Sequence, residues 1–213
     1  METVAPLRDR WQQRWEQSRE WLSLGPIFIP VGDRLFEKYS EAGRHYHDAR
    51  HILACLKTLD TYPGRVGNAN ALELAIWYHD VIYDPRANDN EAQSAAFFRR
   101  EFQAFASGVD KVERLILATR HGVVEPETAD EALLIDIDLG VLGAEAPRYQ
   151  GYAEEIRREY AHVPDRQYRE GRSRVLKSFL GRKHIYQTRH FRRLLEERAR
   201  ENLVRELDLL VGN

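Results

Sequence analysis

The side chains best suited to chemistry are histidines that lie close to aspartates in the first half of the chain. Three of the eight histidines fall within residues 45–51, and His47 and His51 are four residues apart. On a helix this spacing places both imidazoles on one face, where they can bind a single metal ion. The same spacing also fits two histidines on the surface or in a packed core, so it does not identify a site by itself.

The adjacent pair His79–Asp80 gives a stronger indication. Residues 69–83 are apolar almost all round, which predicts a central buried helix that carries this pair. An isolated buried carboxylate is unfavourable, so Asp80 requires a cation or good hydrogen bonds. Next to it, the histidine can supply a neutral ligand. The alternative is a buried His–Asp hydrogen bond without metal.

A third acidic position lies in residues 133–142. If this segment is helical, Asp136 and Asp138 point to nearly opposite sides. The helical neighbours of Asp138 are all large and apolar, so Asp138 is expected to be the more buried of the two acids. A helix cap, or a partner for a buried arginine, is the alternative. Carboxylates combined with imidazoles suit manganese, iron, cobalt, nickel, zinc or magnesium, without selecting one.

The order of these residues in an otherwise helical chain resembles the HD superfamily of metal-dependent phosphohydrolases. The strings RHYHDARHI, WYHDVIYD, NDNEAQSA and IDIDLGVLG are similar to those of a bacterial subfamily of predicted HD phosphohydrolases. The resemblance covers residues from about 35 to about 210. It implies that His47, His79, Asp80 and Asp138 bind one divalent metal ion.

The resemblance also suggests roles for other residues. His51 would face the site or recognise substrate, and His121 would be an extra ligand if two metal ions were bound. His121 also sits where a helix is expected to end before Gly122, a position at which the helix dipole favours histidine. We therefore expect one metal ion.

Three further residues are candidates for catalysis and substrate binding. Asp84 and Glu91 lie just beyond the His-Asp pair and are candidates for proton transfer. Asp84 equally fits a turn before Pro85, and Glu91 equally fits a capping box with Asn88. Arg44 can hold a phosphate through its forked donors, or it can pair with a surface acid.

These features predict a metal-dependent phosphohydrolase that acts on a small phosphorylated compound, for example a nucleotide. The alternatives are a non-catalytic HD protein that binds a nucleotide or a phosphate signal, an HD-type di-iron oxygenase, and a structural helical adaptor. A set of aromatic and basic residues in the second half is a candidate lining for a nucleotide pocket, although such faces are usually only solvated: Tyr149, Tyr152, Arg157, Arg158, Tyr160, Tyr168, Arg172 and Arg174.

The elements that must position these residues are helices. Apolar residues recur at helical spacing along most of the chain, and no alternating strand pattern is found. We expect an all-α, compact, orthogonal bundle of about ten helices in a single HD-type domain, residues 1–213. Its metal-site core would span about 35–145, and its C-terminal helices about 147–210.

Composition and charge indicate which partners and which cellular compartment to expect. The 213 residues have a formal net charge of −2, which makes a nucleic-acid partner unlikely on overall charge but leaves room for a local basic patch. The single cysteine, Cys55, suits a reducing compartment and is expected to be buried. No run of about 20 apolar residues predicts a membrane span, so we expect a cytoplasmic protein. The leucines of residues 188–210 also leave a homo-oligomer open.

Overall fold

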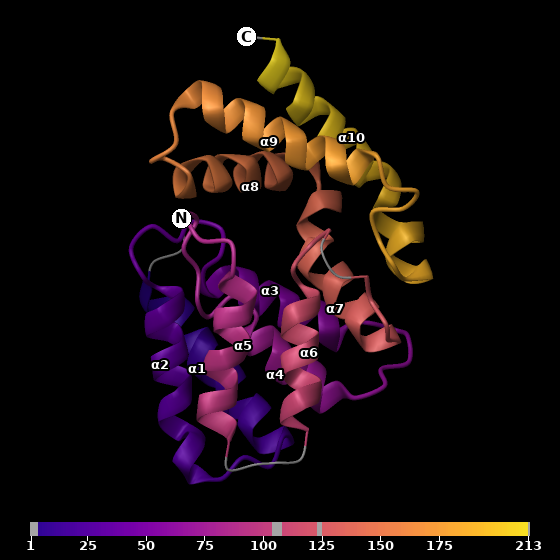
Figure 1. Ribbon diagram of the computed structural model, residues 1–213. Helices are drawn as coiled ribbons and strands as arrows, with labels where there is room; N and C mark the ends of the chain where they lie inside the picture. The colour runs from indigo at the N-terminus through magenta and orange to yellow at the C-terminus, as the bar shows by residue number, and fades with distance from the viewer. Residues whose placement is uncertain (1–3, 104–107, 123–124, 213) are drawn as a thin grey trace. The chain divides into compact units, whose positions relative to one another are not determined.

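The computed structural model describes residues 4–103, 108–122 and 125–212 (Figure 1). Within these ranges every regular element is a helix, namely ten α-helices and two short 3₁₀ helices, and none is a strand. This confirms the predicted all-α class. The chain divides into two compact units, Met1–Arg120 and His121–Asn213, and each is described by itself.

The first unit contains the helices before Arg120. They are α1 (Val4–Trp21), η1 (Pro26–Phe28), α2 (Ile29–Tyr39), α3 (Ala49–Asp60), α4 (Ala69–Tyr78), α5 (Asn90–Phe102) and α6 (Val109–Ala118). Helix α4 contacts α3, α5 and α6. It is therefore the central element of this unit, as its apolar sequence predicts.

Buried tryptophans pack α1 against the rest of the first unit. The rings of Trp11 and Trp15 lie 4.7 and 5.2 Å from the ring of Trp77 on α4, and all three are buried. Trp11 donates its indole N–H to the carbonyl of Gly32 at 2.8 Å. A Cβ at Gly32 would clash with the ring of Trp15, so only glycine allows α2 to approach so closely. The result is a rigid aromatic layer against the helix that leads to His79.

The ends of α3 and α4 differ from the sequence expectation. Asp48 is the N-cap of α3 and accepts a hydrogen bond from the backbone N–H of Arg50 at 2.8 Å, so His47 precedes the helix. The prediction that His47 and His51 share a helical face was therefore wrong. Helix α4 ends at Tyr78, and His79 and Asp80 form its C-terminal turn. Residues 69–83 are thus not one continuous helix.

The second unit contains α7 (Ala129–Asp138), η2 (Leu139–Gly143), α8 (Ala146–Glu159), α9 (Asp165–Leu180) and α10 (Arg189–Val211). Helix α10 packs against both η2 and α9. In neither unit is a described helix both long enough and apolar enough to cross a membrane.

A buried polar network joins three helices of the second unit. Arg172 on α9 binds the carboxylate of Glu206 on α10 through Nε at 2.7 Å and Nη2 at 3.0 Å. Tyr149 on α8 donates its hydroxyl to the same carboxylate at 2.5 Å, and Arg172 Nη1 donates to the Tyr152 hydroxyl at 3.4 Å. These members of the basic and aromatic set therefore bind one another inside the unit.

Candidate metal-binding site

In the first unit, two imidazoles and one carboxylate converge at the end of α4. His51 comes from α3, whereas His79 and Asp80 follow one another in the turn after α4. His51 Nε2 lies 3.2 Å from His79 Nε2 and 3.6 Å from Asp80 Oδ2, and His79 Nε2 lies 3.2 Å from the same carboxylate oxygen. Both histidines are buried, at 5% and 1% exposure. Three potential ligand atoms therefore meet in a largely desolvated place.

The backbone fixes which nitrogen of His79 is available. His79 Nδ1 lies 3.0 Å from the carbonyl oxygen of Ile76. A carbonyl only accepts, so this hydrogen bond requires the proton on Nδ1. In the neutral imidazole, the lone pair of Nε2 then faces the Asp80 carboxylate. Two acceptors 3.2 Å apart repel unless a second proton or a metal cation lies between them.

The spacing of the three donor atoms fits a metal ion. A ligand nitrogen or oxygen lies about 2.0–2.2 Å from zinc, so two donors in a tetrahedral shell are about 3.3 Å apart. The separations of 3.2, 3.2 and 3.6 Å match that figure. Two imidazoles with one carboxylate suit zinc, iron, manganese, cobalt or nickel, and leave coordination positions for water or substrate.

Arg44 holds the backbone around this cluster. Its Nη1 donates to the carbonyls of His47 at 2.9 Å and Asp80 at 2.7 Å, and its Nη2 donates to the carbonyl of Val81 at 2.9 Å. The guanidinium also lies over the ring of Tyr39, 5.1 Å from the centroid, and its side chain is only 3% exposed. Arg44 was predicted as a phosphate ligand or as the partner of a surface acid. Its Nη2 does lie 3.8 Å from a carboxylate oxygen of Glu41, but its closest contacts direct its donors to the backbone of the turn, and its phosphate role stays a prediction.

His47 and Cys55 flank His51. The His47 ring stacks on Tyr83 at 4.2 Å, and its centroid is 6.1 Å from that of His51. The close donor cluster of this unit contains His51, His79 and Asp80, so the structure places the predicted substrate residue His51 where the first ligand, His47, was expected. The ligand role of His47 stays a prediction. Cys55 is buried as predicted, with Sγ 3.8 Å from both ring nitrogens of His51.

The second unit holds its own histidine–aspartate pair. Asp138 ends α7, and its Oδ2 lies 2.8 Å from His121 Nε2, while His121 Nδ1 is buried and has no hydrogen-bond partner among the described residues. The two residues predicted as fourth ligand and extra ligand are therefore neighbours. Their ligand roles stay predictions.

The expectation that Asp138 is the more buried acid was wrong. Asp136 is 0% exposed, whereas the Asp138 side chain is 14% exposed. The backbone N–H groups of Gln187 and Thr188 donate to Asp136 at 2.6 and 2.7 Å, and these bonds offset the cost of its burial. Burial nevertheless raises the pKa of Asp136 to about 6.

Asp84 and Glu91 lie on the segment that follows the cluster. Asp84 is exposed, and its side chain accepts from the backbone N–H of Arg86 at 2.9 Å, which is the predicted turn around Pro85. Asn90 stabilises the same turn. Its side-chain oxygen accepts a hydrogen bond from the backbone N–H of Asp84, and its side-chain N–H donates to the carbonyl of Asp84. The predicted capping box was wrong, since Asp89, and not Asn88, is the N-cap of α5. Neither acid belongs to the donor cluster, and their catalytic roles stay predictions.

Comparisons with known proteins give no family for the chain. No family model matches it, and no curated protein or solved structure gives a significant match.

Proposed function

We propose that this protein is a metal-dependent phosphohydrolase that acts on a small phosphorylated compound, for example a nucleotide. One observation carries the proposal: in the first unit, His51, His79 and Asp80 place three donor atoms at metal-ligand spacing. The order of the motif residues, which resembles that of HD phosphohydrolases, supports the reaction class. The resemblance also gives His47 and Asp138 as ligands, and mutation tests each of them separately.

A bound divalent ion would polarise a phosphoryl oxygen and activate water for attack. The residues of the chain prepare the place for it. The hydrogen bond from His79 Nδ1 to the Ile76 carbonyl keeps the Nε2 lone pair directed at the cluster. The three bonds of Arg44 hold the turn that carries Asp80. Glu91 and Asp84 are our candidates for proton transfer, from their place after this turn.

The proposal places the activity in the cytoplasm. The single cysteine supports a reducing compartment, since the chain has no second cysteine with which to form an internal disulfide.

A combined measurement of metal content and hydrolysis tests the proposal. Wild type is loaded with manganese, iron or zinc, desalted and analysed by mass spectrometry, beside Asp80→Ala, His47→Ala and Asp138→Ala. Generic phosphomonoesters and phosphodiesters are then supplied with each loaded protein. We expect near-stoichiometric metal and hydrolysis in wild type, with both lost in folded Asp80→Ala.

The outcomes separate the functional alternatives. Full metal content and full hydrolysis in Asp80→Ala would overturn the assignment of the site. Metal binding without hydrolysis of any phosphoester would favour the non-catalytic binding protein. Retention of metal in His47→Ala or Asp138→Ala would remove that residue from the ligand set and leave the cluster of the first unit intact.

A further inference from the structure

The second unit contains a long segment without acidic residues. Residues 171–195 include eight lysines and arginines, two histidines and no aspartate or glutamate. The whole chain has a formal net charge of −2, so the +8 of this segment is balanced by −10 elsewhere. Such asymmetry marks a local basic field that the net charge conceals.

This segment forms the second half of α9, a connecting loop and the first turns of α10. Five of its cations are exposed and have neither a hydrogen bond nor an ion pair within the described part of the chain: Arg174, Lys177, Lys183, Arg189 and Arg193. By contrast, Arg172 is buried against Glu206, and Arg192 donates to the carbonyls of Tyr186 and Gln187.

The loop that presents these cations is held firmly. Arg200 donates to the carbonyls of Leu180, Arg182 and Lys183 at 2.8–3.2 Å. Glu196 accepts from the backbone N–H groups of Ile185 and Tyr186 at 3.0–3.2 Å. Asp136 accepts from the two N–H groups that follow. Glu196 and Asp136 are thus used by the backbone, and the cations are exposed on a loop that these hydrogen bonds hold in place.

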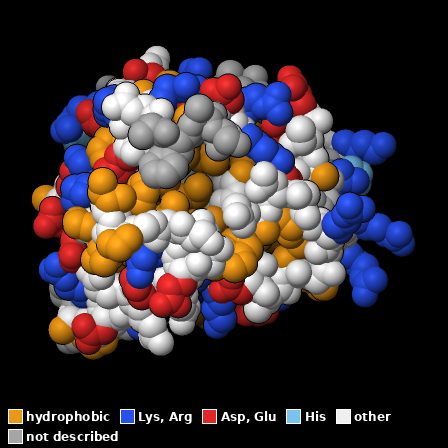
Figure 2. Space-filling model, turned by 90° about the horizontal axis from the view of Figure 1, so that it is seen from below, with side chains coloured by type: hydrophobic (Ala, Val, Ile, Leu, Met, Phe, Trp, Pro, Cys, Tyr) orange, Lys and Arg blue, Asp and Glu red, His pale blue; other side chains and the backbone are white. Residues whose placement is uncertain are grey.

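The electrostatics of this surface favour an added anion. Helix α10 has no acidic residue in its first turn, although the positive end of the helix dipole lies there and Arg189 is its first residue. Burial lowers the pKa of Arg182, and Glu125 opposes that shift only in part. Figure 2 shows that Lys and Arg side chains project together from the right-hand edge of the molecule in that view.

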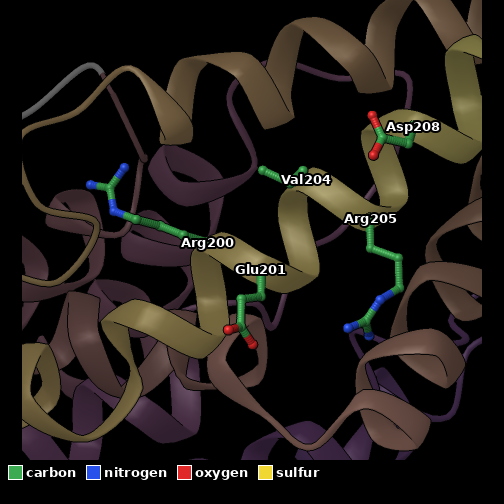
Figure 3. Close-up of a pocket in the computed structure, with 5 residues that line it drawn as sticks. All are labelled: Arg200, Glu201, Val204, Arg205 and Asp208. Atoms are coloured by element: carbon green, nitrogen blue, oxygen red, sulfur yellow. The ribbon is translucent and has the colours of Figure 1, made fainter.

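The basic surface ends within α10. Glu197 is the first exposed acid on this helix, one turn beyond Arg193. Further along, charges of both signs and Val204 line a surface groove, shown in Figure 3: Arg200, Glu201, Val204, Arg205 and Asp208. The unbalanced cations are therefore confined to the α9–α10 corner.

We propose that this corner binds the phosphate backbone of double-stranded nucleic acid. Cations spread over two helix ends and a loop fit an extended chain of phosphates better than one small anion. The aromatic side chains of the segment, Phe179, Tyr186 and Phe191, are all buried. They provide neither the stacking platform that single strands use nor the exposed aromatic anchors of a membrane-binding surface. Binding is therefore independent of sequence and strongly dependent on salt.

Fluorescence anisotropy with a labelled 24-base-pair duplex, the matching single strand and anionic vesicles tests this proposal. The probes are titrated with wild type, with Lys183→Gln/Arg189→Gln/Arg193→Gln, and with a control, Lys57→Gln/Arg65→Gln/Arg86→Gln. The control changes three exposed cations of the first unit that have no ion pair among the described residues, and it alters the net charge equally. Circular dichroism confirms that each variant is folded.

We expect wild type to bind the duplex with a log–log salt slope of about −4, since each phosphate contact contributes about −0.9. The corner variant should bind at least ten-fold more weakly at 50 mM salt, with a slope closer to zero by about 3, and the control should change less than three-fold. Equal losses in both variants would overturn the proposal, as would absence of duplex binding, preference for the single strand, or binding to vesicles alone. None of these outcomes bears on the metal site, because the readout requires no metal.

Discussion

The two units differ in how their buried polar side chains are paired. In the second unit, Arg172 and Glu206 neutralise each other through two hydrogen bonds, and the Tyr149 hydroxyl donates to the same carboxylate. In the first unit, the Nε2 atoms of His51 and His79 face each other and the Asp80 carboxylate at 3.2–3.6 Å. Each donor of the network meets an acceptor in the second unit, whereas the cluster of the first unit brings three potential ligand atoms together.

This difference is the one we expect between a structural network and the metal site proposed above. A buried network in which each donor meets an acceptor needs nothing from outside and ties its helices together. A cluster of potential metal-ligand atoms, as we propose for the first unit, would instead depend on a cation that joins them. The comparison predicts that mutations in the second unit change stability without metal, and that mutations in the first change metal binding more than stability.

The largest expected effect comes from breaking the network of the second unit. Glu206→Leu leaves the Arg172 guanidinium buried without its counter-ion, which should lower the free energy of unfolding by roughly 3–5 kcal/mol. Arg172→Met combined with Glu206→Leu should recover much of this loss, because no buried charge is left unpaired. Urea denaturation of metal-free protein measures both changes. A loss below about 1 kcal/mol in the single variant would show that the network is not the structural element we infer.

A smaller effect is expected at Arg44, which we assign as a positioning residue of the candidate metal site. Arg44→Met removes three hydrogen bonds to the carbonyls of His47, Asp80 and Val81. We expect metal affinity to fall about 10–100-fold, as is typical when groups that orient ligands are lost. Arg44→Lys should recover part of the affinity, since an ammonium group can replace some of the donors.

Arg50→Met is the matched control for Arg44. Arg50 is close in sequence but exposed, and it pairs with Asp48 at the start of α3. Isothermal titration with manganese, together with thermal unfolding without metal, separates affinity from stability. If both arginine variants kept wild-type affinity while Arg44→Met only lowered the unfolding temperature, Arg44 would be a purely structural residue.

The sequence predicts the helices well because each buries an apolar stripe. The C-terminal helices were expected at about 147–210, and α8, α9 and α10 lie within residues 146–211. Helix ends were harder to predict, because they depend on single hydrogen bonds. Asp48 is the N-cap of α3, so His47 lies before the first residue of this helix. Helix α4 ends at Tyr78, so Asp80 lies in the turn that follows it.

The site could be predicted only in part. The His79–Asp80 pair was evident because charged residues are rare in so apolar a segment. The burial of Asp136 was not evident, since it depends on two N–H groups about 50 residues further along the chain. The same holds for Arg44, whose partners Asp80 and Val81 are 36 and 37 residues away. Local patterns do not record such long-range hydrogen bonds.

The smallest expected effect gives the sharpest test of the comparison. Asp80→Asn replaces a carboxylate oxygen with an amide that can donate to His79 Nε2, 3.2 Å from the present carboxylate oxygen. Without metal, we expect the variant to be as stable as wild type or up to about 1 kcal/mol more stable, which raises the unfolding temperature by about 2–4 °C at most. Metal should stabilise wild type strongly and the variant hardly at all. A metal-free variant that is clearly less stable than wild type would indicate that the Asp80 carboxylate accepts a hydrogen bond from an imidazolium. The cluster would then be a buried His–Asp ion pair, closer in kind to Arg172–Glu206 than to a metal site.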